Sequence, residues 1–272
     1  FEGIVDTAAN TTLTALDSID GGLGNDTLNI LAATTLNTTS IAGLEVKNVE
    51  TVTIKGAAAV TADTTSWTGT NTLNVTKATT VNVDAATTTD VNVSGATDDI
   101  TVQGGKDITI TDNTAASTIT VEDTNGDTTG NYATGKITIT DTKFGATEKI
   151  DVDGGTDVTI TATADKVNVG AITVGASKTA TGDVKIVSNT TSDGTATNAG
   201  NVTVTGGKTV EITANMTNTA VKGKAGGDIT AGVYKVTADN TTTNVTITQN
   251  ATATNFENDA AAGTAEVSTV TF

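Results

Sequence analysis

The sequence contains no cysteine, proline, histidine or arginine, and it has few aromatic residues. The absence of cysteine excludes disulfides and thiolate metal sites, and the absence of histidine as well excludes Ser-His and Cys-His nucleophile systems. Aromatic residues make up 3% and hydrophobic residues 36% of the 272 residues. We therefore expect a thin core of small side chains rather than a bulky globular one.

Basic residues are scarce as well. The chain has 14 lysines against 31 acidic residues, which gives a net charge of -17. Because the lysines are scattered and phosphate binding requires clustered basic side chains, nucleic acid and anionic membranes are disfavoured as partners. No apolar run approaches the length of a membrane span, so we expect no membrane insertion. Cations are the natural counter-charge.

The residues that are abundant favour β-structure. Threonine makes up about a quarter of the chain, and Val, Ile, Asn, Asp, Ala and Gly supply most of the rest. From residue 73 onward an apolar-polar-apolar triplet recurs every 8 to 11 residues in its first copies. The triplets begin at Leu73, Val81, Val91, Ile100, Ile108, Ile119, Ile137, Ile150, Val158, Val167, Ile172, Val184, Val202, Val210 and Val245. This period of two predicts short strands with one buried face.

A longer period lies on top of the triplets. The segments "TVQGGKDITIT" from Thr101, "DVDGGTDVTIT" from Asp151 and "TVTGGKTVEIT" from Thr203 each contain a strand, a Gly-Gly corner and a second strand. They recur after 50 and then 52 residues. A fixed long period indicates a repeat architecture in which each unit buries its apolar face against its neighbours.

Together the two periods predict an all-β fold, a right-handed parallel β-solenoid (β-helix) with short strands and two or three strands per coil. Tandem immunoglobulin-like β-sandwiches are the alternative, since they also show a turn signal every 8 to 12 residues or so. Sandwich strands are usually about five to six residues long, and their cores usually include large aromatic side chains. The thin triplets and the Gly-Gly corners favour the solenoid.

One turn matches the sequence motif of a calcium site. Residues 21 to 29, "GGLGNDTLN", match the nonapeptide G-G-x-G-x-D-x-U-x at every specified position. Glycines allow the sharp turn and aim carbonyl oxygens inward, and the aspartate supplies a charged oxygen. Calcium prefers about six to eight oxygen ligands, so Asp17, Asp20 or a neighbouring turn must complete the shell. The predicted calcium ligands are Asp17, Asp20, Gly21, Gly22, Gly24 and Asp26; the alternative is a sharp corner before a strand.

Other acidic corners are weaker candidates. Residues 123 to 127, "DTNGD", begin like a calcium loop but lack the distal glutamate, which is more typical of a solvated turn. Residues 153 to 157, "DGGTD", place two carboxylates beside a glycine corner and are more typical of a structural turn. The pair Asp98-Asp99 is interpreted as a solvated corner beside a strand.

Two segments carry a resemblance to a known family. "ALDSIDGGLGNDTL" (Ala15 to Leu28) and "VKNVETVTI" (Val46 to Ile54) resemble segments of calcium-dependent bacterial surface-layer proteins of the repeats-in-toxin type. The resemblance implies type I secretion, an extracellular or cell-surface location, calcium-driven folding and assembly into a lattice or filament. We expect residues 1–60 to form an N-terminal segment with the calcium turn and residues 61–272 to form the Thr/Val-rich solenoid body. The single nonapeptide, rather than a tandem block, is a departure from the toxins and proteases of this type.

Three function classes follow. The favoured one is a structural, homo-oligomeric surface-layer or filament subunit, with cell-surface polysaccharide as a second candidate partner. An adhesin or an ice-binding face is the second class, although the uneven spacing of the T-x-T pairs argues against a coherent array. These pairs begin at Thr109, Thr118, Thr138, Thr159, Thr203 and Thr246. A polysaccharide-active β-helix enzyme is least favoured, so we expect no enzymatic activity. The closing segment "EVSTVTF" is interpreted as a secretion signal, a cap or a donated strand.

Overall fold

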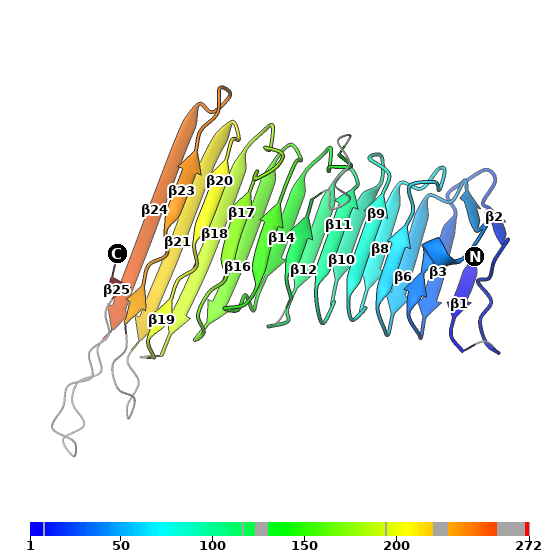
Figure 1. Cartoon of the computed structure of the whole chain (residues 1–272), viewed down its shortest axis with the longest axis horizontal. Helices are drawn as coiled ribbons and strands as arrows, with labels where there is room; N and C mark the ends of the chain where they lie inside the picture. The colour runs from blue at the N-terminus through cyan, green and yellow to red at the C-terminus, as the bar shows by residue number, and fades with distance from the viewer. Residues whose placement is uncertain are drawn as a thin grey trace, which may run out of the picture.

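The computed structural model is a stack of parallel β-coils (Figure 1). It describes residues 1–7, 9–115, 117–122, 130–193, 195–219, 228–254 and 270–271. Within these ranges regular structure is almost entirely β-strand, interrupted by one short 3-10 turn, η1 (Thr38–Ser40). Neighbouring strands in both large sheets pair in parallel, as in the pairs of β10 (Asp90–Ser94) with β12 (Ile108–Asp112) and of β11 (Ile100–Gly104) with β13 (Ile119–Val121). The predicted solenoid is confirmed, and tandem sandwiches are wrong because their sheets are antiparallel.

Each coil between β3 and β23 contributes one strand to each of two sheets, and β1 and β24 extend the first sheet at its two ends. In the described residues, sheet 1 has eleven strands and sheet 2 has nine. Sheet 1 runs in the order β1 (Glu2–Val5), β3 (Thr27–Ala32), β6 (Thr51–Gly56), β8 (Thr72–Thr76), β10, β12, β14 (Ile137–Asp141), β16 (Val158–Asp165), β18 (Val184–Ser192), β21 (Thr209–Thr219) and β24 (Asn244–Thr254). Sheet 2 runs in the order β4 (Leu36–Asn37), β7 (Val60–Asp63), β9 (Val81–Ala85), β11, β13, β15 (Lys149–Val152), β17 (Ala171–Val174), β20 (Val202–Thr205) and β23 (Tyr234–Thr237).

The core lies between the two sheets and consists of stacked ladders of branched side chains. In β12 Ile108 and Ile110 are buried while Thr109 and Thr111 are exposed. Because the strands pair in register, each inward residue stacks on an inward residue of the next coil, as Ile110 does on Ile139. The triplets predict this burial correctly for most strands. Val167-Asn168-Val169 is an exception, since it lies in the connection between β16 and β17 and Val167 is 45% exposed.

The predicted Gly-Gly corners join sheet 2 to sheet 1. Gly104, the last residue of β11, and Gly105 have φ angles of 67° and 79°. The glycine pairs after β15 and β20 also have positive φ angles. Two consecutive left-handed residues reverse the chain sharply at little cost only if they are glycine. The strands before these corners, β11, β15 and β20, are two coils apart, so the long period in the sequence corresponds to two coils.

The coils widen toward the C-terminal end, as Figure 1 shows. Ile108 follows its register partner Val91 by 17 residues, whereas Val245 follows Val210 by 35. The last two strands of sheet 1, β21 and β24, are each 11 residues long. A small third sheet of β19 (Thr197–Asn198), β22 (Ile229–Thr230) and β25 (Val270–Thr271) accompanies the widened coils.

The stack is continuous across residue 60. Sheet 1 passes in register from β6 to β8, and one core cluster extends from Leu13 to Ile212. At the N-terminal end β2 (Ser18–Asp20) pairs with β5 (Glu45–Lys47) in a sheet of two strands. The predicted segments 1–60 and 61–272 therefore share one stack of coils. No helix in the described ranges is long and apolar enough to cross a membrane.

Candidate functional site

The predicted calcium turn connects β2 to β3 and lies against the next coil. Oδ1 of Asp20 accepts hydrogen bonds from the backbone N–H of Gly22 at 3.0 Å and from Nδ2 of Asn48 at 2.8 Å. The Asn48 bond, followed by the Gly22 bond, lowers the pKa of Asp20 below its usual value. The second coil therefore places an amide donor and Lys47 beside this carboxylate.

The glycines of the turn are needed for different reasons. Gly22 and Gly24 have φ angles of 82° and 128°, which L-residues rarely adopt. At Gly21 a Cβ atom would lie only 1.9 Å from the carbonyl oxygen of Asn48. The turn prediction is confirmed, and Gly21 additionally permits the close approach of two coils.

The predicted acidic ligands Asp17 and Asp26 make hydrogen bonds with different neighbours. Oδ2 of Asp17 accepts a hydrogen bond from the backbone N–H of Thr14 at 2.6 Å, and the backbone N–H of Asp26 donates to Oε2 of Glu50 at 2.7 Å. In the described ranges no group of three or more acidic side chains could hold a metal ion. Calcium binding by this turn stays a prediction.

A pair of glycine variants separates structural packing from metal binding in this turn. We expect Gly21→Ala to destabilise the fold by about 1 to 3 kcal/mol or more, because the Asn48 carbonyl must move. Gly22→Ala should cost about 1 to 2 kcal/mol, since its Cβ meets open space and only the left-handed backbone is strained. Urea unfolding in calcium and in excess chelator measures the free energy of unfolding of both variants. If Gly21→Ala is destabilised only in calcium, the packing role of Gly21 is contradicted.

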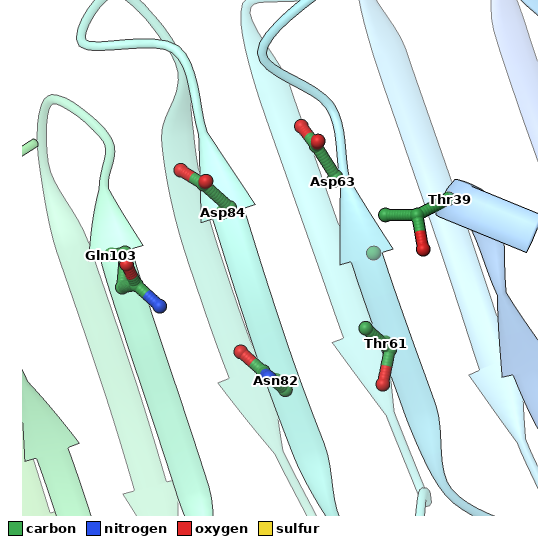
Figure 2. A pocket seen from close by; sticks show the side chains of 7 residues that line it. Thr39, Thr61, Asp63, Asn82, Asp84 and Gln103 are labelled. Carbon is green, nitrogen blue, oxygen red and sulfur yellow. The ribbon is translucent and has the colours of Figure 1, made fainter. Parts of the chain in front are cut away.

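A polar groove of about 250 Å³ lies on sheet 2 (Figure 2). Asp63 and Asp84 are register partners on β7 and β9, and Figure 2 shows them side by side. Thr39, Thr61, Ala62, Asn82 and Gln103 complete the lining. Nδ2 of Asn131 donates to Oδ1 of Asp84. The groove offers hydroxyl, amide and carboxylate groups on a rigid sheet, a surface that can accept hydrogen bonds from a polar ligand.

The structure also contains a buried acidic cluster that the sequence-based predictions missed. Asp112 and Asp141 are register partners at the ends of β12 and β14, and both are fully buried. Glu148, just before β15, is 2% exposed. One oxygen of each carboxyl group accepts a hydrogen bond from a nearby backbone N–H. The N–H of Thr114 donates to Asp112, that of Lys143 to Asp141, and that of Gly145 to Glu148.

The other oxygen of each carboxyl group in this cluster is buried without a hydrogen-bond partner. These atoms are Oδ2 of Asp112, Oδ2 of Asp141 and Oε1 of Glu148. Burial, together with the nearby charges of Asp112 and Glu148, raises the pKa of Asp141 to about 7. Burial also raises the pKa of Glu148, and the charge of Asp112 adds to that shift. Asp141 and Glu148 therefore keep their protons to a higher pH than ordinary carboxyl groups do.

A sequence signal for this cluster existed. "ITITD" occurs at residues 108–112 and again at 137–141, and the final aspartate has the same inward parity as the two isoleucines. Among the weaker candidates, Asp153 is structural as predicted, because Oδ1 accepts from the backbone N–H groups of Ser177 and Lys178. Residues 123–127 and most of the closing segment "EVSTVTF" lie outside the described ranges.

Three of the T-x-T pairs align on sheet 1 although their spacing along the sequence is uneven. Thr109, Thr138 and Thr159 form one column on neighbouring strands, with Thr111, Thr140 and Thr161 in the column beside it. The expectation that uneven spacing prevents alignment is wrong for these three pairs, because the extra residues lie in the corners. The array ends at β18, where Lys185 and Val187 occupy the same columns.

No protein-family model matches the chain, and no curated protein matches its sequence.

Proposed function

We propose that this chain is a secreted structural protein that self-assembles at a cell surface through the open edge of β24. The observation that carries the proposal is the contrast between the two ends of the coil stack. The resemblance of residues 15–28 and 46–54 to surface-layer proteins supports the extracellular location.

The N-terminal end of sheet 1 is covered. The backbone N–H groups of Thr12 and Leu13 donate to the carbonyl of Ile4, and the N–H of Ile4 donates to Oγ1 of Thr12. Leu13 is 3% exposed and belongs to the main core cluster. Residues 11–13 therefore blunt the edge of β1, as natural proteins often do at sheet edges.

At the opposite edge, no strand of the described ranges pairs with the outer side of β24. All 11 residues of β24 are exposed, although Val245 and Ile247 stack in register on the buried Val210 and Ile212. Val245 and Ile247 are 41% and 43% exposed, so the core ladder ends in a half-covered apolar row. A long edge with apolar side chains and unpaired backbone groups is a template for another strand.

Charge and length favour a second copy of β24 as the occupant. The segment 244–254, "NVTITQNATAT", has no charged residue, whereas the whole chain carries -17. Two copies therefore repel each other least where these strands meet. β1 has four residues and a blunted edge, so the matching partner is the 11-residue β24 of a twofold-related copy.

The experiment compares two lysine variants on the same strand. Ile247→Lys places a charge on the inward row of β24, and we expect it to weaken self-association at least about tenfold. Thr246→Lys makes the same charge change on the outward row and should leave association intact. Light scattering across a concentration series, with electron microscopy, measures the assembly. A wild-type chain that stays monomeric at every concentration overturns the proposal.

Calcium is tested in the same experiment. Millimolar calcium and excess chelator are compared for the wild-type chain and for Asp26→Ala. Chelation should dissociate the assembly before it unfolds the coils, because cations offset repulsion between acidic subunits. Association that is identical in chelator and in calcium would leave β24 pairing in place and remove calcium from the proposal.

A further inference from the structure

We propose that Asp141 and Glu148 hold protons as buried acids beside Asp112, so that the coil spanning β12 to β15 loses stability as the pH rises toward neutrality. This inference is independent of the proposed assembly. It rests on the positions of the three carboxyl groups, on their hydrogen bonds, and on the one buried oxygen of each that has no hydrogen-bond partner.

The cluster lies inside the coil stack rather than on a solvated corner. Asp112 and Asp141 occupy inward positions of neighbouring parallel strands, which lie about 4.8 Å apart. Phe144, which is fully buried, follows Asp141 by three residues, and the next residue in the inward ladder is the buried Ala162. Water therefore does not solvate these carboxyl groups, and three ionised groups in this position would carry a large desolvation penalty.

Basic side chains do not compensate the cluster. The charged groups on the flanking segments are Lys143, Lys149 and Asp165, and all three side chains are exposed. The ion pairs within the described ranges involve Lys47, Lys106, Lys136 and Lys185, which lie elsewhere. On the flanking strand β16 the register partner of Asp141 is Ala162, which cannot titrate.

Protons, rather than a metal ion, complete the cluster. The described residues include no acidic group of three or more that could hold a metal. The three unpartnered oxygens are acceptors when ionised, and a proton on one of them turns it into a donor toward a neighbour.

The direction of the pH effect follows from the difference between the folded and unfolded states. The pKa of Asp141 is about 7 in the fold, whereas an unfolded aspartate has a value of about 3.9. The folded chain binds more protons between these two values, so its stability falls as the pH rises through this window. Above the folded value Asp141 is ionised in both states, and the loss of stability levels off.

The test compares thermal unfolding of the wild-type chain and two Asp→Asn variants across pH. We expect the wild-type Tm to fall by on the order of 5 °C between about pH 5 and about pH 8. Asp141→Asn keeps an acceptor for the Lys143 N–H but cannot ionise, so it should lose most of this fall and exceed the wild type at high pH. Asp151→Asn makes the same charge change on the outward face of β15 and should keep the wild-type slope.

Two outcomes overturn the proposal. One is a pH slope in Asp141→Asn that equals that of the wild type and of Asp151→Asn. The other is stabilisation of the wild type by calcium at high pH that is lost in Asp141→Asn, which would make the cluster a cation site. Carboxyl ¹³C NMR provides a readout that does not depend on unfolding, since a resonance lost in Asp141→Asn should titrate near neutral pH.

Discussion

Replacing Ile108 by aspartate is expected to unfold the solenoid. Ile108 is 1% exposed and stacks between Val91 and Ile137 in the inward ladder of sheet 1. The change removes about 1.5 to 3 kcal/mol of side-chain burial and adds the cost of an unpaired charge in the core, together about 5 kcal/mol or more. Whole domains are typically stable by only about 5 to 15 kcal/mol.

Thr109→Asp is the matched control for this prediction. Thr109 is the next residue of the same strand, but its side chain is exposed, so the same new charge should change stability by less than about 1 kcal/mol. Urea unfolding followed by circular dichroism compares the two variants. Equal destabilisation by both would show that β12 does not have one buried and one solvated face.

Truncating Phe144 is expected to have the second largest effect. Phe144 is the largest fully buried side chain in the described ranges, and its backbone N–H donates to the carbonyl of Thr163 at 2.9 Å. In a chain with so few aromatic residues, Phe144→Ala should cost about 3 to 5 kcal/mol through lost burial and the cavity that remains. Narrow coils cannot collapse easily around such a cavity, because hydrogen bonds fix the strand spacing.

Phe144→Leu serves as the control for the cavity. It keeps an apolar side chain of similar reach and should cost less than about 1.5 kcal/mol. Calorimetry or urea unfolding of both variants measures the difference. If Phe144→Ala is no more destabilising than Phe144→Leu, the side chain does not fill the coil interior as the structure places it.

Local periodicity is the part of the fold that could be predicted most completely. The triplet Val158-Thr159-Ile160 forms part of β16 with its outer members buried, because alternation along a strand is a property of the backbone. The same parity rule applied to "ITITD" would have placed Asp112 and Asp141 in the core. No prediction was made for these two aspartates, because the triplet pattern was followed only as far as the second isoleucine.

The predicted calcium turn was correct in backbone, and its binding of calcium stays a prediction. The glycines of the motif predicted a left-handed backbone, and Gly22 and Gly24 have positive φ angles. Whether carboxylates converge depends on the residues of the next coil, and that coil brings Asn48 to Asp20 and Glu50 to Asp26. The triplet Val245-Thr246-Ile247 forms a strand as predicted, but nothing in the described ranges covers its apolar side chains. The sequence pattern predicts the strand and does not predict whether a neighbour covers it.

The sequence by itself determined the strands, their inward and outward faces and the glycine corners, because each depends on a few neighbouring residues. Only the tertiary structure decided which coils stack in which register and where the longer connections leave the stack. It also decided that residues 11–13 cover the edge of β1, whereas no described strand covers the edge of β24. It further decided that three carboxyl groups, two from strands and one from a connection, are buried with no ion pair to a lysine in the described ranges. Such features depend on pairing between segments 17 to 35 residues apart, and a single coil has no buried interior until its neighbours cover it.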